Sequence, residues 1–213
     1  FHRFMELPEE TRLIIWDLAI HDQPYTSPAG SSERYLCTTI KLREYVSAKD
    51  DPIRPRFLPP ICLTSEKTTE KTIAVLIEGS TFMVASIHDK NFLQAFLKAA
   101  PGRLSLCRQL NFDYFGRFPK GYEKNADLGL AAQCSGLHTI KLTFHYASLT
   151  YKVASGDYED GLTSVPCSAE DLFERFRLAR LLDCQELKVI IIEHTDYYIE
   201  AAIQAAESLG QMI

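Results

Sequence analysis

Apolar and polar positions along this chain follow two periods, which predicts helices and strands in alternation. Apolar residues recur at helical spacing over residues 63–80, 88–102, 125–136, 168–184 and 196–210. Short runs rich in β-branched and aromatic residues predict strands over residues 35–42, 81–86, 104–115, 137–146 and 186–194. Strands that alternate with helices usually form a mainly parallel sheet with crossover helices. The expected fold class is therefore α/β.

A further helix is expected near the start of the chain, and it is apolar on almost every side. Pro8 suits a first helical turn, where its missing N–H would have no partner, and Glu9 and Glu10 favour the positive end of the helix dipole. The apolar residues that follow are Leu13, Ile14, Ile15, Trp16, Leu18, Ala19 and Ile20. A surface helix usually buries one apolar stripe. We therefore expect this helix to carry more apolar surface than its own chain covers.

Helix-capping residues support several of these assignments. Asp89 and Asn125 stand where N-caps are expected, and Ser168 followed by Asp171 resembles a capping box. The predicted helix that follows Ser168 runs to residue 184 without a proline or glycine. We therefore expect one long amphipathic helix there.

A short pattern recurs where a helix gives way to a strand. One copy is Cys134, Leu137, Ile140 and Leu142, and a second is Cys184, Leu187, Ile190 and Ile192. Part of the pattern fits Cys107, Leu110 and Phe112. Leucine-rich repeats share this arrangement of a strand backed by a helix, although the copies here are irregularly spaced. Two interpretations stay open: a curved, degenerate leucine-rich-repeat-like array, or a plain α/β sheet whose strands begin alike.

Composition and charge narrow the class of partner. The chain has 213 residues, of which 46% are hydrophobic and 24% charged, as in an ordinary globular protein. The net charge of -5 argues against nucleic acid, which prefers a basic surface. No apolar run approaches the roughly 18 residues needed to span a bilayer, so no membrane partner is expected. The six cysteines are scattered singly, which favours reduced thiols and a cytoplasmic or nuclear location.

The chain lacks the common catalytic and cofactor motifs. It contains no glycine-rich nucleotide loop, no nucleophile elbow and no paired-cysteine or histidine zinc motif. Three histidines, His138, His145 and His194, lie in or beside predicted strands, but scattered histidines are usually surface groups or groups with partners inside the fold. We therefore expect no enzyme activity, no metal site and no cofactor.

Three long connections interrupt the regular pattern, at residues 21–35, 114–125 and 147–167. The last two follow strands, so both are expected at the carboxyl edge of a parallel sheet, where α/β folds usually bind ligands. Aromatic side chains and arginine are enriched in interface hot spots. The candidate residues are Tyr114, Phe115, Arg117, Phe118, Tyr122, Tyr151 and Tyr158. They form either a protein-binding edge or internal packing of the loops themselves.

Two stretches resemble a known family. The first is "LPEETRLIIW", carried by Leu7, Pro8, Glu10, Arg12, Ile15 and Trp16. The second is carried by Leu58, Ser65, Glu70, Ser80 and Phe82. Together they resemble a group of fungal F-box-like proteins over residues 1 to about 100. The chain departs from that pattern because a loop and a strand follow its first helix, where a compact F-box packs three helices.

The resemblance implies an adaptor of a cullin-type ubiquitin ligase. Its partners would be Skp1, docked by the first helix, and a substrate protein held by the rest of the chain. The docking residues would be Leu7, Pro8, Ile14, Ile15, Trp16 and Leu18. Residues 1–61 would form an F-box-like N-terminal segment with loops, and residues 62–213 a repeat-like α/β domain. The alternatives are a stand-alone interaction domain that does not bind Skp1, or an enzyme with a site at the carboxyl edge of the strands.

Overall fold

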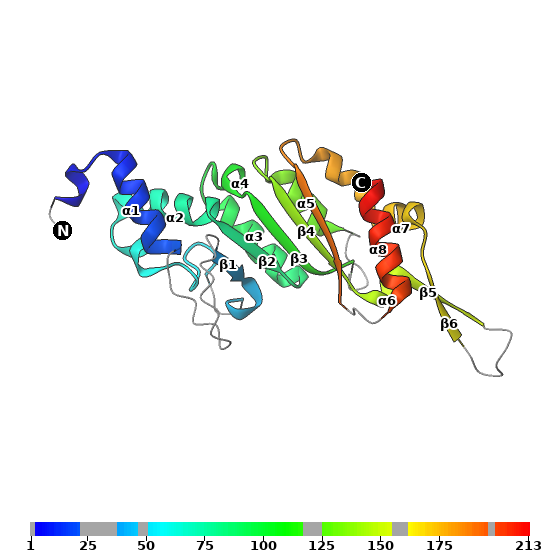
Figure 1. Cartoon of the computed structure of the whole chain (residues 1–213). Helices are drawn as coiled ribbons and strands as arrows, with labels where there is room; N and C mark the ends of the chain where they lie inside the picture. Colours follow the sequence, from blue (N-terminus) through cyan, green and yellow to red (C-terminus); the bar gives the residue numbers. More distant parts are fainter. Residues whose placement is uncertain (1–2, 22–37, 47–50, 117–124, 155–161, 196–198) are drawn as a thin grey trace, which may run out of the picture.

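A computed structural model describes residues 3–21, 38–46, 51–116, 125–154, 162–195 and 199–213 (Figure 1). Five strands form one sheet in which every neighbouring pair is parallel. They are β1 (Thr38–Lys41), β2 (Ser80–Val84), β3 (Gln109–Phe115), β4 (Thr139–Phe144) and β7 (Val189–His194). Their order in the sheet is their order in the sequence. The expectation of an α/β fold with a mostly parallel sheet is confirmed.

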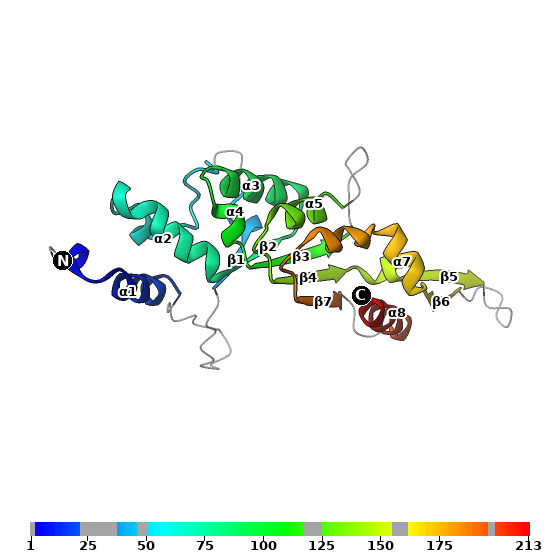
Figure 2. The same cartoon turned by 90° about the horizontal axis from the view of Figure 1, so that it is seen from above.

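The helices between these strands lie on one side of the sheet. They are α2 (Glu66–Glu78), α3 (Ile87–Lys98), α4 (Arg103–Leu106) and α5 (Ala126–Gln133), followed by α7 (Ala169–Arg175) and the 3₁₀ helix η4 (Leu178–Asp183). Figure 2 shows α3, α4 and α5 above the sheet seen nearly edge-on. Crossovers between parallel strands are right-handed. Because each crossover here leads to the next strand in the same direction, each helix is placed on the same face.

Side-chain alternation along the strands produces the core. Ile40, Phe82, Leu110 and Ile140 stand side by side across β1 to β4 and are all buried beneath the helices. Their neighbours on the opposite face are polar: Thr39, Thr81, Gln109 and Thr139. Successive side chains of each strand therefore alternate between the packed face of the sheet and the opposite face.

The repeated pattern lies in register in all three copies. Ile140 pairs with Ile190, and Leu142 pairs with Ile192, as alignment of the two copies requires. The partial copy is also in register, because Leu110 pairs with Ile140 and Phe112 pairs with Leu142. The spacing of Cys107, Leu110 and Phe112 is that of Leu137, Ile140 and Leu142, so the partial copy matches the later part of the pattern.

The N-terminal helices form a layer of their own beside α2. The 3₁₀ helix η1 (Phe4–Glu6) leads into α1 (Glu9–His21), which contacts α2 and the 3₁₀ helix η3 (Pro60–Leu63). Another 3₁₀ helix, η2 (Leu42–Glu44), follows β1 directly. Since β1 belongs to residues 1–61 and pairs with β2, the N-terminal segment contributes an edge strand to the sheet.

The connection between β4 and α7 has structure that the sequence pattern did not reveal. It contains α6 (Tyr146–Leu149) and an antiparallel hairpin of β5 (Thr150–Ala154) and β6 (Leu162–Pro166). The hairpin projects away from the main sheet (Figures 1 and 2). The last helix, α8 (Glu200–Met212), contacts β7, α6, α7 and the hairpin.

Several local expectations were wrong or hold only in part. Residues 104–106 of the strand expected over 104–115 belong to α4, and β3 begins only at Gln109. Arg177 has a left-handed backbone with φ of 50°, which divides the expected helix at 168–184 into α7 and η4. Ser86, and not Asp89, is the N-cap of α3, and its hydroxyl accepts a hydrogen bond from the Asp89 backbone N–H. Asn125 is the N-cap of α5 but forms no capping hydrogen bond with its side chain. The cap at Ser168 is confirmed, since its Oγ accepts from the Asp171 N–H at 3.1 Å.

Candidate interaction surfaces

Helix α1 turns one side to the protein and leaves the other apolar side in solvent. Trp16 and Ile20, one helical turn apart, are each only 2% exposed. On the other side Ile14 is 61% exposed, Leu18 55% and Ile15 38%. We call these last three residues the α1 outer face. Met5, Leu7, Leu13 and Leu63, on the same or neighbouring helices, are also exposed apolar residues. Exposed apolar groups gathered in this way are typical of interaction surfaces.

The sequence-based docking residues therefore divide into two groups. Leu7, Pro8, Ile14, Ile15 and Leu18 are exposed. The inclusion of Trp16 is corrected, because its ring is buried and lies 5.7 Å from the Phe4 ring, measured between centroids. Tryptophan is a residue type enriched in interface hot spots. Trp16, however, lies on the buried side of the helix with Ile20, and it anchors α1 to its own chain.

Contacts at both ends of the helix fix the orientation of α1. Near its start, Lys71 of α2 forms an ion pair with Glu9, and this contact lowers the pKa of the Glu9 carboxyl. At its end, the ring of His21 reaches the carbonyl oxygen of Val75 at 3.3 Å. The two contacts reach different turns of α2, so the outer face is directed away from α2.

The expected binding edge at the strand ends is only partly described. Tyr114 is half-exposed at the end of β3. The inclusion of Phe115 is corrected, because it is 1% exposed and packs against the rings of Phe144 and Phe176. Tyr151 is 50% exposed on β5. The remaining candidates lie outside the described residues: Arg117, Phe118, Tyr122 and Tyr158.

The strands that precede these two connections do end at the same edge. Phe115, near the end of β3, pairs with Phe144 at the end of β4, so both connections leave the sheet side by side. Phe115 is nonetheless directed inward, because the ladder shifts register between Phe112 and Phe115. Such an irregularity redirects side chains at a strand end.

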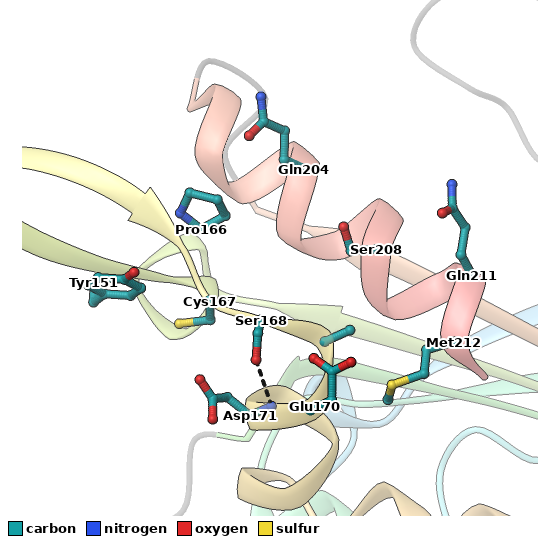
Figure 3. A pocket seen from close by; sticks show the side chains of 11 residues that line it. Tyr151, Pro166, Cys167, Ser168, Glu170, Asp171, Gln204, Ser208, Gln211 and Met212 are labelled. Carbon is teal, nitrogen blue, oxygen red and sulfur yellow. Dashed lines mark hydrogen bonds between the residues drawn. The ribbon is translucent and has the colours of Figure 1, made fainter.

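A groove of about 640 Å³ lies between α7, α8 and the base of the hairpin (Figure 3). We call it the α7–α8 groove. Its α7 side consists of Ser168, Ala169, Glu170 and Asp171, and its α8 side of Gln204, Ser208, Gln211 and Met212. Tyr151, Pro166 and Cys167 complete its lining. Of the sequence-predicted candidates that the structure describes, Tyr151 lines this groove.

Sequence reasoning missed this groove, although α8 carried a usable signal. Its buried residues are Ala201, Ala202, Ala205, Ala206 and Leu209, while Gln204, Ser208 and Gln211 form a polar stripe on the outside. The stripe follows the helical period, but the sequence does not show that α7 lies opposite it. That arrangement requires the chain to fold back after β7.

A smaller hollow of about 290 Å³ lies at the opposite ends of the strands. It is lined by Arg108, Gln109, Gly136, His138, Thr139, Glu186 and Lys188. Arg108 donates a hydrogen bond to the Gly136 carbonyl at 3.1 Å and lies 3.5 Å from the Glu78 carboxylate. The Arg108 guanidinium is therefore already bound by groups of the protein. We assign this hollow a structural role.

Histidines and cysteines do not assemble into a metal site in the part of the chain that the structure describes. His138 lies before β4, while His145 and His194 lie at the other end of the sheet, so these three do not converge. Among the described residues, no group of three or more histidine, cysteine or acidic side chains could hold a metal ion. The described cysteines are buried and unpaired as disulfides: Cys62, Cys107, Cys134, Cys167 and Cys184.

Burial keeps several thiols protonated. A hydrogen bond with the Cys134 thiol, together with burial, raises the pKa of Cys107 well above its usual value. Burial also raises the pKa of Cys184 to about 11. Because the thiolate is the reactive form, these cysteines are packing residues.

Among the described residues, one buried carboxyl group has a raised pKa. Asp127, near the start of α5, is 9% exposed. Burial raises the pKa of its carboxyl to about 6, and the charge of Lys90 opposes the shift. Ionisation of Asp127 therefore lowers the stability of the folded protein.

The geometry defines a mixed α/β protein with two candidate interaction surfaces, an exposed apolar helix face and an open polar groove. A comparison with protein-family models, with curated proteins and with solved structures found no match to this chain. In the segments described, no helix combines the length and the apolar character that crossing a membrane requires.

Proposed function

We propose that this chain is a protein-recognition module that docks on Skp1 through the α1 outer face, as an F-box-type substrate adaptor. The single observation that carries the proposal is the exposure of Ile14, Ile15 and Leu18 while Trp16 and Ile20 are sealed. A helix held by one side and apolar on the other is suited to insertion against a partner helix or groove. The likeness of residues 7–16 to F-box-like proteins suggests which partner.

The arrangement around α1 is compatible with this role. Its attachment through Trp16 and its contacts with Lys71 and Val75 hold the outer face in place before a partner arrives. A preformed surface costs less ordering entropy on binding. In place of three consecutive helices, α1, η3 and α2 pack together although β1 and η2 intervene in the sequence.

The sheet would then serve as the scaffold that holds a substrate protein. We propose that it is a degenerate leucine-rich-repeat-like array. This is supported by parallel strands in sequence order and by the in-register pairs Ile140–Ile190 and Leu142–Ile192. Free cysteines in the described part of the chain support a cytoplasmic or nuclear location, where thiols stay reduced.

The test is co-purification of the chain with Skp1, comparing Ile14→Asp and Leu18→Asp with the unaltered protein. Each variant places a charge in the centre of the outer face, and we expect at least about tenfold weaker binding, as for a central interface residue. Leu182→Asp is the matched control, because Leu182 is an apolar residue 84% exposed on η4, far along the chain from α1. It should bind like the unaltered protein.

Circular dichroism and thermal melting of the same variants separate the possible results. Loss of binding with an unchanged fold supports docking through α1. Global unfolding of Ile14→Asp would place α1 in the core and contradict the proposal. A folded protein that never retains Skp1 would identify a stand-alone interaction domain.

A further inference from the structure

The α7–α8 groove has the size and shape of a binding site for a short extended segment. Its polar stripe on α8 runs from Gln204 to Gln211, seven residues along a helix, which corresponds to roughly 10 Å. An extended chain covers that length with about three residues. The groove is open to solvent.

The charge of the groove selects the kind of segment. Glu170 and Asp171 supply two carboxylates, and none of the described lining residues is a lysine, arginine or histidine. Neither carboxylate forms an ion pair with a described residue. Figure 3 shows the Glu170 side chain directed from α7 toward Ser208 on α8. An anionic ligand would be repelled here, whereas a cation would find two unpaired charges.

The neighbouring arginine does not neutralise these carboxylates. Arg175, one turn beyond Asp171 on α7, donates to the Ser148 carbonyl oxygen at 3.1 Å and to the Cys167 sulfur at 3.6 Å. Lys152 follows Tyr151 on β5 and points to the opposite face of the hairpin, because successive strand residues alternate. The negative charge of the groove thus stays available.

The remaining lining suits a peptide and not a bare ion. Tyr151 presents a half-exposed ring at one end, on which a cationic side chain can stack. Pro166, Ala169 and Met212 offer apolar contact to the aliphatic part of a lysine or arginine. Ser208 and Gln211 can pair with a peptide backbone, while the Gln204 amide is partly engaged by Glu200 at 3.3 Å.

We propose that the α7–α8 groove binds an extended segment of a partner protein through a lysine or arginine side chain, which Glu170 and Asp171 pair with beside Tyr151. This inference rests on the proposed role in protein recognition and names the chemistry of a second surface. It does not involve the α1 outer face.

The experiment is a titration of the ¹⁵N-labelled chain, followed by amide chemical shifts. The probe is a capped pentapeptide with two arginines among alanines, and the neutral control peptide has citrulline in their place. We expect shifts concentrated at residues 168–171 and 204–212 with the arginine peptide, and much smaller ones with citrulline. Shifts spread over all exposed carboxylates, or equal shifts with citrulline, would overturn the proposal.

A matched pair of variants tests the two carboxylates. The double change Glu170→Gln and Asp171→Asn should weaken peptide binding about fivefold to tenfold, the range for two exposed ion pairs. The control double change, Glu174→Gln and Glu207→Gln, removes the same charge from exposed positions on α7 and α8 outside the groove. Equal binding by the two double variants would show that net charge and not the groove attracts the peptide.

Two further titrations distinguish a protein segment from a free cation, and the groove from the α1 outer face. Free arginine amide lacks the flanking backbone and should bind at least about fivefold more weakly than the peptide; equal binding would mean a site for free cations and would refute a protein segment. Ile14→Asp should leave peptide binding unchanged. The proposal of peptide binding in the groove can therefore be refuted while Skp1 docking is supported, and the reverse outcome is equally distinguishable.

Discussion

Replacing Asp127 by asparagine should stabilise this protein at neutral pH. The Asp127 carboxyl is buried near the start of α5, and burial raises its pKa from 3.8 to about 6. In the unfolded chain the carboxyl ionises near its ordinary value. Ionisation is therefore harder in the folded protein, and the folded state loses stability as the pH rises from about 4 through 6. Below about pH 3 both states are protonated and no penalty remains.

The magnitude follows from the two pKa values. One pKa unit corresponds to about 1.4 kcal/mol, so the shift of Asp127 costs about 3 kcal/mol at pH 7. A carboxylate in the first helical turn gains up to about 1 kcal/mol from the helix dipole, which asparagine gives up. The expected net gain for Asp127→Asn is thus about 2 kcal/mol at pH 7. For a chain of this length, that raises Tm by roughly 4–8 °C.

Urea denaturation followed by circular dichroism at pH 4 and pH 7 provides the measurement. The gain should be near 2 kcal/mol at pH 7 and only about 0.5 kcal/mol at pH 4, because the folded carboxyl is protonated there and the unfolded one is only partly ionised. Glu174→Gln, an exposed carboxylate on α7, is the control and should change stability little at either pH. An equal gain at both pH values, or none at pH 7, would refute desolvation of Asp127 as the cause.

Two further predictions concern the buried residues. Trp16→Ala should destabilise the protein by about 3–5 kcal/mol in urea denaturation, because the ring is 2% exposed and packs on Phe4. Leu18→Asp, on the exposed side of α1, should cost under about 1 kcal/mol. Similar costs for the two variants would mean that the two sides of α1 are assigned wrongly. Cys107, Cys134 and Cys184 should resist alkylation by iodoacetamide at pH 7 in the folded protein and react after denaturation, as read by peptide mass spectrometry, and rapid labelling of folded Cys107 would contradict its burial.

Local patterns predicted the elements well where one period dominated. The β-branched run 189–192 formed β7, and the cap at Ser168 formed with the bond that its spacing to Asp171 suggests. The patterns failed where tertiary contacts decided. Nothing in the apolar periodicity of residues 168–184 marks Arg177 as left-handed. Likewise, Phe115 and Tyr114 are both aromatic and adjacent, yet a register shift buries one and half-exposes the other.

The sequence by itself determined the class of fold and the surplus of apolar residues on the first helix. Both properties follow from local periodicity, which neighbouring residues show without any contact to distant parts of the chain. Only the tertiary structure decided which residues of α1 are exposed, because Trp16 and Ile14 are equally apolar and the position of α2 chooses between them. The α7–α8 groove was likewise decided in three dimensions. Its two walls lie on helices separated by β7, and no local pattern states that they face each other.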